Sequence, residues 1–267
     1  MKVILMGTPD FVVPIFEAVA NEHDVISVFT RAPKPAGRRR VLAKTPAHVW
    51  AESKNFPVYT DIKKIIGLPR PDYIIVAAYG VILKQYVMDL APCLNIHPSL
   101  LPKYRGAAPI ISAVMNGDCE SGVCLMKMAA EVDAGDILMC EKFSIGENET
   151  TADIEKKAAA IAARLILDYL ESPEKYPRRP QVGIPTFTKK IMAADAIIDW
   201  KKTPTEIHNK IRAVGGRTKI NGTDVKILET KIEDGKLKIV RLQPAGKNPM
   251  MWADFENGRR GIIKIGE

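Results

Sequence analysis

Short apolar segments alternate with amphipathic segments through the first two thirds of the chain, and this alternation restricts the fold more than any other feature. The short segments are apolar at nearly every position, as strands are when both faces of their sheet are covered. The segments between them repeat apolar residues with helical spacing. We therefore predict an α/β fold, a Rossmann-like, mostly parallel sheet covered by helices. The expected strands are residues 2–6, 24–29, 73–78, 93–97, 122–128 and 136–145, and the expected helices are residues 11–20, 45–54, 84–90, 109–116 and 151–170.

The pattern changes after residue 173. Residues 174–190 contain three prolines and few apolar side chains, which is typical of a linker. Beyond them, two short strand patterns flank Asp234-Gly235, a strong hairpin-turn signal. We predict an α/β domain at residues 1–173, a linker at residues 174–190 and a small β-rich domain at residues 191–267.

The composition is that of an ordinary soluble globular protein, with 267 residues of which 46% are hydrophobic and 26% charged. Charged residues or prolines interrupt every apolar run well before the roughly 18 residues of a membrane span, so we expect a cytoplasmic protein without membrane contact. The net charge of +8 favours a polyanionic partner, although many basic proteins have none. The four cysteines form no zinc-site pattern, so we expect no metal and reduced, buried thiols.

The densest group of reactive side chains lies at the end of the expected strand 93–97. Asn95 and His97 are two residues apart, so both side chains point to one face of an extended strand. In open α/β sheets, ligands bind outside the carboxyl ends of the strands. An amide can donate to a developing oxyanion, and an imidazole can move a proton near neutral pH. An acidic turn at residues 131–136 offers Asp133 to orient the imidazole, and an amine substrate would need no nucleophile from the enzyme.

Other interpretations of these residues stay open. A single histidine at a strand end is often structural, and acidic turns are often only solvated turns. Ser99 could act as a nucleophile, but its segment lacks the G-x-S-x-G pattern. His23, His48 and His208 have no second polar group at functional spacing, and we interpret all three as structural.

A basic loop follows the expected strand 24–29. Residues 31–44 concentrate six positive charges with two prolines and a glycine, and the loop is longer than most connections of its kind. These charges suit an RNA backbone, and a solvated loop without a partner is the alternative. Residues 7–11 form a glycine turn before a helix but do not match G-x-G-x-x-G, which argues against a dinucleotide-dependent redox enzyme.

Several separated segments resemble the methionyl-tRNA formyltransferases, a branch of the wider group of 10-formyltetrahydrofolate-dependent transferases. Residues 95–110 (NIHPSLLPKYRGAAPI) and 133–136 (DAGD) are similar to the signature of the family. Residues 7–11 (GTPDF), 34–38 (KPAGR) and 242–247 (LQPAGK) resemble the branch that acts on tRNA. The resemblance covers nearly the whole chain.

The resemblance implies a reaction in which the amino group of methionine on initiator tRNA attacks the formyl carbon of 10-formyltetrahydrofolate. The expected partners are methionyl-tRNA and the folate, and we expect a monomer without a metal. Asn95, His97 and Asp133 match the catalytic trio of the family. Ser99, Leu100, Leu101 and Pro102 match its folate-contacting segment, with Tyr79 and Gly80 beside the pterin pocket. Arg31, Lys34, Arg38, Arg39, Arg40 and Lys44 lie in the loop that matches its tRNA-contacting insertion.

The carboxyl end departs from the family pattern. Family members usually end in an open β-barrel of the oligonucleotide-binding (OB) kind, and residues 213–243 are too few for all its strands. After Ala213, the family's tryptophan and proline-containing turn are replaced by residues 214–217 (VGGR). We therefore predict a small, shortened OB-like barrel, whose share in tRNA binding stays open.

Three other activities are compatible with the sequence. The nearest is a formyltransferase acting on a small amine, such as an amino-sugar nucleotide or glycinamide ribonucleotide, which would not need the basic loop. A non-catalytic RNA-binding protein on the same scaffold would not need all three residues of the trio. Slow folate hydrolysis could also occur at such a site.

Overall fold

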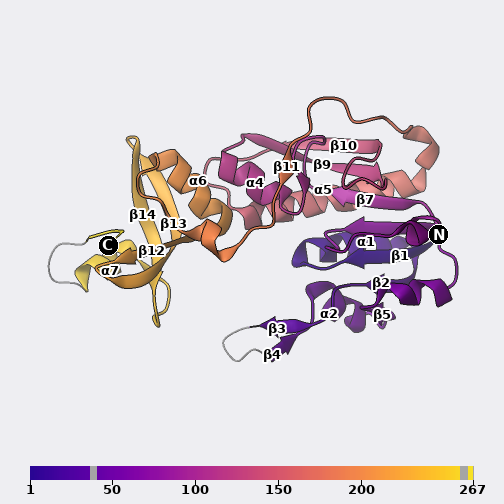
Figure 1. Cartoon of the computed structure of the whole chain (residues 1–267), viewed down its shortest axis with the longest axis horizontal. Coiled ribbons are helices and arrows are strands. Elements are labelled where there is room, and N and C mark those ends of the chain that lie inside the picture. Colours follow the sequence, from indigo (N-terminus) through magenta and orange to yellow (C-terminus); the bar gives the residue numbers. More distant parts are fainter. Residues whose placement is uncertain (37–40, 259–263, 267) are drawn as a thin grey trace. The chain divides into compact units, whose positions relative to one another are not determined.

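A seven-stranded sheet with strand order β10-β9-β7-β6-β1-β2-β5 forms the first part of the protein (Figure 1). This computed structural model describes residues 1–36, 41–258 and 264–266. Strands β5, β2, β1, β6 and β7 are mutually parallel, and β9 pairs antiparallel with β7. The predicted Rossmann-like, mostly parallel sheet is therefore confirmed. The strands are β1 (Lys2–Gly7), β2 (Asp24–Phe29), β5 (Val58–Tyr59), β6 (Tyr73–Ala77), β7 (Cys93–His97), β9 (Glu120–Lys127) and β10 (Ile137–Ser144).

The chain divides into two compact units, which we call the sheet unit and the C-terminal unit. The sheet unit consists of Met1–Pro109, Gly122–Phe143 and Glu155–Thr188, and the C-terminal unit of Ile110–Ser121, Ser144–Ile154 and Lys189–Glu267. The sheet and the candidate site described below belong to the sheet unit. Among the described residues, none of the helices combines the length and the apolar run that crossing a membrane requires.

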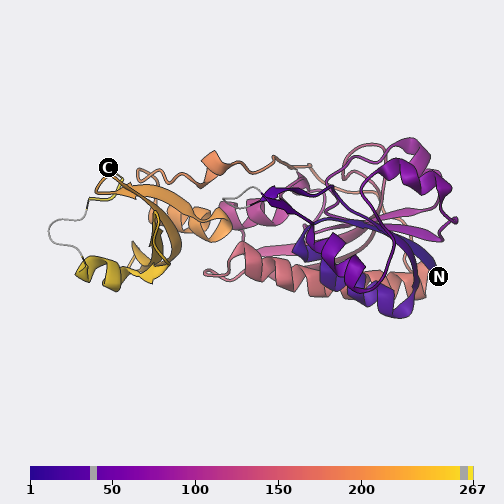
Figure 2. The same cartoon turned by 90° about the horizontal axis from the view of Figure 1, so that it is seen from below.

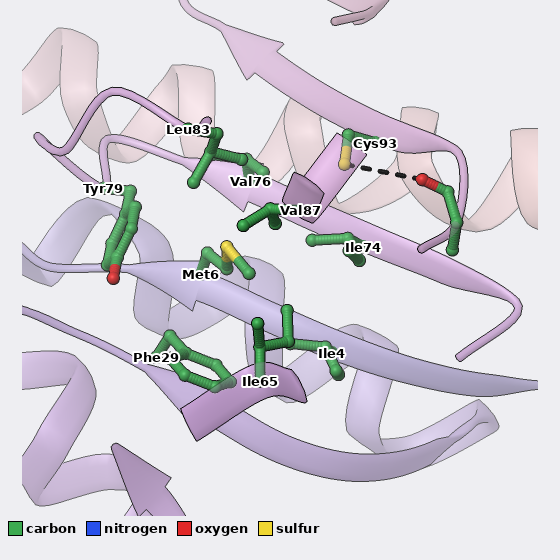
Figure 3. Packing of buried hydrophobic residues seen from close by; sticks show 11 residues of the cluster. Ile4, Met6, Phe29, Ile65, Ile74, Val76, Tyr79, Leu83, Val87 and Cys93 are labelled. Carbon is green, nitrogen blue, oxygen red and sulfur yellow. Dashed lines mark hydrogen bonds between the residues drawn. The ribbon is translucent and has the colours of Figure 1, made fainter. Parts of the chain in front are cut away.

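Both faces of the sheet are covered, which explains why its strands are apolar throughout. Ile4 and Met6 of β1 pack into a buried cluster on one face, together with side chains from η2, α3, β6 and β7 (Figure 3). Val3 and Leu5 alternate with them and are fully buried on the opposite face. Helices α1 and α5 lie together on one face of the sheet (Figure 2). The helices are η1 (Asp10–Val12), α1 (Val13–Glu22), α2 (Pro46–Ser53), η2 (Ile62–Gly67), α3 (Gln85–Met88), α4 (Pro109–Asn116) and α5 (Thr151–Glu171).

Local capping chemistry fixes where helix α2 begins. Thr45 precedes it in an extended conformation, and its side-chain oxygen accepts the backbone N–H of His48 at 3.1 Å. Pro46 occupies the first helical position, where a missing N–H costs no helical hydrogen bond. The predicted start of this helix is confirmed.

The described residues of the basic loop include two short strands that the sequence did not predict. Residues on either side of its tip form a short antiparallel hairpin of β3 (Lys34–Ala36) and β4 (Val41–Ala43) (Figure 1). Val41 and Leu42 are exposed on β4. Arg38, Arg39 and Arg40, three of the six predicted tRNA-contacting residues, lie outside the described residues.

The prediction that all four cysteines are reduced and buried is wrong. Cys124 on β9 and Cys140 on β10 are joined by a disulfide, because these strands lie side by side in the sheet. Cys119 is an exposed free thiol. Cys93 is buried as expected, and burial raises the pKa of its thiol to about 12.

The C-terminal unit contains a four-stranded antiparallel sheet in the order β12-β13-β14-β15. Asp234 and Gly235 both have positive φ at the β13–β14 turn, as the predicted hairpin requires. Helix α6 ends at Val214, and β12 begins two residues later. This small sheet agrees with the predicted shortened OB-like barrel. Its elements are η4 (Ala193–Ala196), α6 (Pro204–Val214), β12 (Gly216–Ile220), β13 (Thr223–Glu233), β14 (Lys236–Pro244), β15 (Met250–Met251) and α7 (Trp252–Asn257).

The proline-rich segment after α5 is attached to the sheet unit along part of its length. It begins with η3 (Pro173–Lys175) and ends with β11 (Phe187–Thr188), which pairs in parallel with β8 (Arg105–Gly106). An isolated antiparallel bridge joins Arg179 to Ile137. We call residues 179–188 the strap.

Candidate active site

Strand alternation places Asn95 and His97 on one face of β7. Cys93, two residues earlier on the same strand, packs into the buried cluster of that face, as Figure 3 shows. The polar pair continues this face toward the carboxyl end of the strand. Both side chains are buried, with 8% of Asn95 and 4% of His97 exposed. Buried polar groups of this kind need hydrogen-bond partners, which the loops after β7 and β9 supply.

Asp133 is the group on which this site converges. Its Oδ1 accepts a hydrogen bond from Asn95 Nδ2 at 3.2 Å, and its Oδ2 accepts the backbone N–H of Gly106 at 2.7 Å. The same Oδ2 lies 3.6 Å from His97 Nδ1. The structure therefore brings together the three residues that the sequence predicted as a trio, although they are up to 38 positions apart.

The hydrogen bond at His97 Nε2 identifies which ring nitrogen can exchange a proton. Nε2 lies 2.9 Å from the carbonyl oxygen of Tyr104, which can only accept, so Nε2 carries the hydrogen. In the neutral ring, Nδ1 then presents its lone pair toward the Asp133 carboxylate. Burial lowers the pKa of His97, while the Asp133 carboxylate and the Tyr104 carbonyl oppose that change. The imidazole is therefore neutral near pH 7 and has a carboxylate beside it that stabilises the cation after proton uptake.

The predicted folate segment follows directly after β7. Ser99 is fully buried, and its hydroxyl donates to the carbonyl of Lys103 at 2.6 Å, so it closes a turn. Leu101 is buried, with 8% of it exposed, whereas Leu100 and Pro102 are partly exposed. The Leu101–Pro102 peptide bond is cis. The two partly exposed side chains are therefore those that a ligand can reach.

Tyr79 and Gly80 follow β6, the parallel neighbour of β7, so they lie at the same sheet edge. The Tyr79 side chain is only 3% exposed and packs beside Phe29 and Leu83 in the buried cluster (Figure 3). Burial also raises the pKa of its hydroxyl. Gly80 is exposed with a φ of 74°, and a Cβ built on it would lie 3.4 Å from the Arg31 side chain. This places Arg31 beside the predicted folate residues.

The other predicted tRNA-contacting residues are farther along the basic loop. Lys34 is exposed on β3. Lys44 is exposed just after β4, but its ammonium group forms an ion pair with Glu52 at 2.7 Å. Of the described predicted residues, Lys34 is thus the one on the hairpin itself.

Sequence reasoning missed two side chains that hold the loops of the trio. Gln181 of the strap donates from Nε2 to the carbonyls of Asp133 at 2.8 Å and Gly135 at 2.9 Å. Its Oε1 accepts from Arg105 Nε at 3.1 Å and Nη2 at 2.8 Å. Arg105 also pairs with Glu131 at 3.2 Å. Linkers also contain single glutamines, so the sequence pattern does not distinguish Gln181 from an ordinary linker residue.

Comparison with known proteins identifies the family. The Formyl transferase family matches residues 1–170, and the Formyl transferase C-terminal domain matches residues 190–237. A methionyl-tRNA formyltransferase from Cereibacter sphaeroides is 36% identical over 292 aligned residues, which cover 97% of this chain and 96% of that relative.

Solved structures share the fold at lower sequence identity. The N-formyltransferase from Helicobacter canadensis, crystallised with folinic acid and dTDP-3-aminofucose, has a TM-score of 0.68 at 23% identity and is covered over 88% of each chain. The methionyl-tRNA formyltransferase from Clostridium thermocellum has a TM-score of 0.66 at 14% identity, covering 91% of this chain and 98% of that chain. Because the sequence match to the Cereibacter sphaeroides relative spans nearly all of both chains, this protein belongs to the formyl transferase family and, within it, to the methionyl-tRNA formyltransferases.

Proposed function

We propose that this protein transfers the formyl group of 10-formyltetrahydrofolate to the amino group of methionine on initiator tRNA, giving N-formylmethionyl-tRNA. The observation that carries the proposal is the convergence of Asn95 and His97 on Asp133 at the carboxyl edge of the sheet. An amide donor, a neutral imidazole and a carboxylate are the groups that acyl transfer to an amine requires. The relative from Cereibacter sphaeroides supports the choice of acceptor.

Each residue of the trio has a distinct task in the proposed reaction. The methionyl nitrogen attacks the formyl carbon that the folate supplies, and the electron pair of the carbonyl double bond moves to the formyl oxygen, which becomes an oxyanion. Asn95 uses one amide hydrogen on Asp133, which leaves its second hydrogen to donate to that oxyanion. His97 Nδ1 takes the proton that the attacking nitrogen loses, and Asp133 stabilises the resulting imidazolium. The proton then passes to the departing folate nitrogen as the old carbon–nitrogen bond breaks.

The sheet edge beside the trio has the surface that a folate ring needs. Val81 and Ile82, which follow Tyr79-Gly80, are 43% and 78% exposed. Leu100 and Pro102 are partly exposed after the neighbouring strand. Apolar side chains with nearby backbone polar groups are the usual lining of a site for a flat heteroaromatic ligand. We therefore propose that these two segments contact the folate.

The basic loop is the proposed contact for the tRNA backbone. Replacing Arg38, Arg39 and Arg40 with alanine should weaken tRNA binding and reduce its dependence on salt, by about 0.7–0.9 in log–log slope for each phosphate that the loop no longer neutralises. Folate affinity should not change. The matched control replaces Lys63 and Lys64, two lysines of η2, and should leave the salt slope unchanged. An unchanged slope in the triple variant would leave the loop without a role in tRNA binding.

The test of the proposed function is formyl transfer from 10-formyltetrahydrofolate to methionyl-tRNA. Unacylated tRNA, free methionine and an amino-sugar nucleotide serve as competing acceptors, and His97→Ala is the control variant. We expect product only with methionyl-tRNA, formed about 10²–10³-fold more slowly by His97→Ala. Transfer to the amino-sugar nucleotide without transfer to methionyl-tRNA would replace the proposed acceptor with a small amine.

A further inference from the structure

We propose that Gln181 of the strap is a positioning residue for the formyl-transfer reaction, holding the Asp133 turn so that the carboxylate faces His97. This inference rests on the proposed function of the trio. It does not make Gln181 a catalytic residue, because its contacts are with Asp133, Gly135 and Arg105. The observations that carry it concern the hydrogen-bond chemistry of the amide, the backbone of the turn and the attachment of the strap.

The surroundings of Gln181 require a side-chain amide. On one side it meets the backbone carbonyls of Asp133 and Gly135, which can only accept hydrogen bonds. On the other side it meets the guanidinium of Arg105, which can only donate. Only a side chain that carries both a two-hydrogen donor and an acceptor satisfies both sides. A glutamate at this position would keep the acceptor and lose both donors.

The turn that Gln181 holds has a backbone that needs external support. Asp133 has a φ of 52°, a left-handed conformation that an aspartate adopts at a cost in energy. Two residues later, a Cβ on Gly135 would collide with the backbone carbonyl of Lys127, so the turn packs closely on β9. The two hydrogen bonds from Gln181 span this part of the turn, on both sides of Ala134. They therefore hold the conformation that directs the Asp133 side chain.

The strap is fixed at both ends of Gln181, so the amide has a defined position. On one side, Arg179 and Ile137 exchange two backbone hydrogen bonds at 2.8 and 2.9 Å. On the other, Thr186 accepts the backbone N–H of Tyr104 through its side chain at 2.8 Å and that of Arg105 through its carbonyl at 2.8 Å. The strap thus joins the loop after β9 to the loop after β7, which contributes the Tyr104 carbonyl to His97.

The consequence for the reaction follows from the charges around His97. Among the described residues, Asp133 is the charged group that faces the His97 ring. Gln181 connects Arg105, which pairs with Glu131, to the turn that carries Asp133. The Asp133 carboxylate raises the pKa of His97 against the effect of burial. If the turn relaxes and the carboxylate moves away, His97 loses this support and becomes a weaker base.

The experiment compares Gln181→Met, Gln181→Glu and the matched control Gln243→Met. Methionine has a similar length and adds no charge, while glutamate keeps only the contact with Arg105. Gln243 also uses Nε2 to bond a turn carbonyl, that of Lys247, but it lies in the C-terminal unit. For each protein we would measure kcat, the two KM values, Tm and the titration of the His97 imidazole by NMR.

We expect kcat to fall about 10- to 100-fold in both Gln181 variants, as displacements near 1 Å in an active site can cause, with little change in either KM. The pKa of His97 should fall in Gln181→Met, whereas kcat and the His97 titration should stay unchanged in Gln243→Met. A lower Tm with normal kcat and normal His97 titration would overturn the proposal and leave Gln181 a structural residue. Normal kcat in Gln181→Glu would overturn it as well, because only the Arg105 contact would then matter.

The NMR titration separates this inference from the proposed function, because it needs no substrate. If the unmodified protein does not formylate methionyl-tRNA, the proposed function fails, yet the effect of Gln181→Met on His97 still tests the positioning role. If the unmodified protein is active and Gln181→Met titrates and turns over normally, the positioning role alone fails.

Discussion

Two buried histidines, His97 in the sheet unit and His208 in the C-terminal unit, differ in what surrounds them. Their exposed fractions are 4% and 5%, and burial is the main cause that lowers the pKa of each. His208 has a neutral partner at both ring nitrogens, Thr230 Oγ1 at 2.9 Å and the Glu147 carbonyl at 3.1 Å. His97 has a carbonyl at one nitrogen and a carboxylate at the other. Burial therefore does not distinguish the two histidines, whereas the carboxylate beside His97 does.

The backbone around the two histidines shows the same contrast. His208 lies inside α6, whose first turn is closed by Thr203 and Glu206 in reciprocal hydrogen bonds. His97 faces a loop in which Tyr104 has a φ of 60° and a turn in which Asp133 has a φ of 52°. Left-handed non-glycine residues persist where surrounding contacts enforce them, and they are frequent at functional sites. If the proposed function holds, one region contributes stability and the other the chemistry.

The largest expected effect tests whether the trio does the chemistry. His97→Ala and Asn95→Ala should each lower kcat about 10²–10³-fold, which is the usual effect of removing a group that acts on the transition state. His208→Ala should keep near-normal kcat per folded molecule, because the hydrogen bonds of its ring go to Thr230 and a backbone carbonyl of the C-terminal unit. Active-site titration with a folate analogue would count the folded molecules. Equal losses in His97→Ala and His208→Ala would remove the contrast.

Asp133→Asn is expected to have a somewhat smaller effect, about 10²-fold on kcat. The amide can still accept the Gly106 N–H but no longer supplies the charge that favours protonated His97. The pKa of His97 should therefore fall, and the acid limb of the kcat profile, where His97 loses its capacity to accept a proton, should move to lower pH. An acid limb that does not move would show that Asp133 does not influence the pKa of the catalytic base.

The matching change in the C-terminal unit should affect stability and leave chemistry intact. Arg212 is 8% exposed and bonds Asn209 and the carbonyls of Gly146 and Glu149. Arg212→Met would remove the hydrogen bonds that this buried guanidinium donates to three acceptors, which typically costs about 1–3 kcal/mol. Urea unfolding would measure the loss, and kcat below the unfolding midpoint should match the unmodified protein. Lost activity without lost stability would contradict the division of roles.

The sequence predicted those features that depend on local pattern. Alternation of residue types on β7 was enough to place Asn95 and His97 on one face, and Thr45-Pro46 was enough to start α2. The proximity of Asp133 was inferred from strand order and from the family resemblance, because periodicity alone does not show how the turn after β9 folds back. Gln181 could not be predicted, because its partners are backbone carbonyls and no pattern records the position of a carbonyl. The disulfide was not predicted for a related reason, because the pairing of β9 with β10 brings Cys124 and Cys140 together.

The smallest expected effect concerns pH and stability at His208. Burial lowers its pKa in the folded state below the ordinary value of 6.5, so the unfolded chain binds the proton more readily. Stability from the neutral ring is therefore fully present above the unfolded-state pKa of 6.5 and is lost as the pH falls from there through the lower pKa of the folded state. His208→Gln removes this titration while keeping an amide that can reach a partner.

The variant should consequently be less stable than the unmodified protein at pH 8, where the lost packing and hydrogen bonds dominate, and the difference should narrow as the pH falls to 5. Urea midpoints at several pH values measure this directly, and groups that titrate alike in both proteins cancel in the difference. A difference that stays constant would mean that His208 binds its proton equally well in both states. In that case the pKa of His208 would not be lowered by burial. The contrast between His208 and His97 would then rest on their hydrogen-bond partners alone.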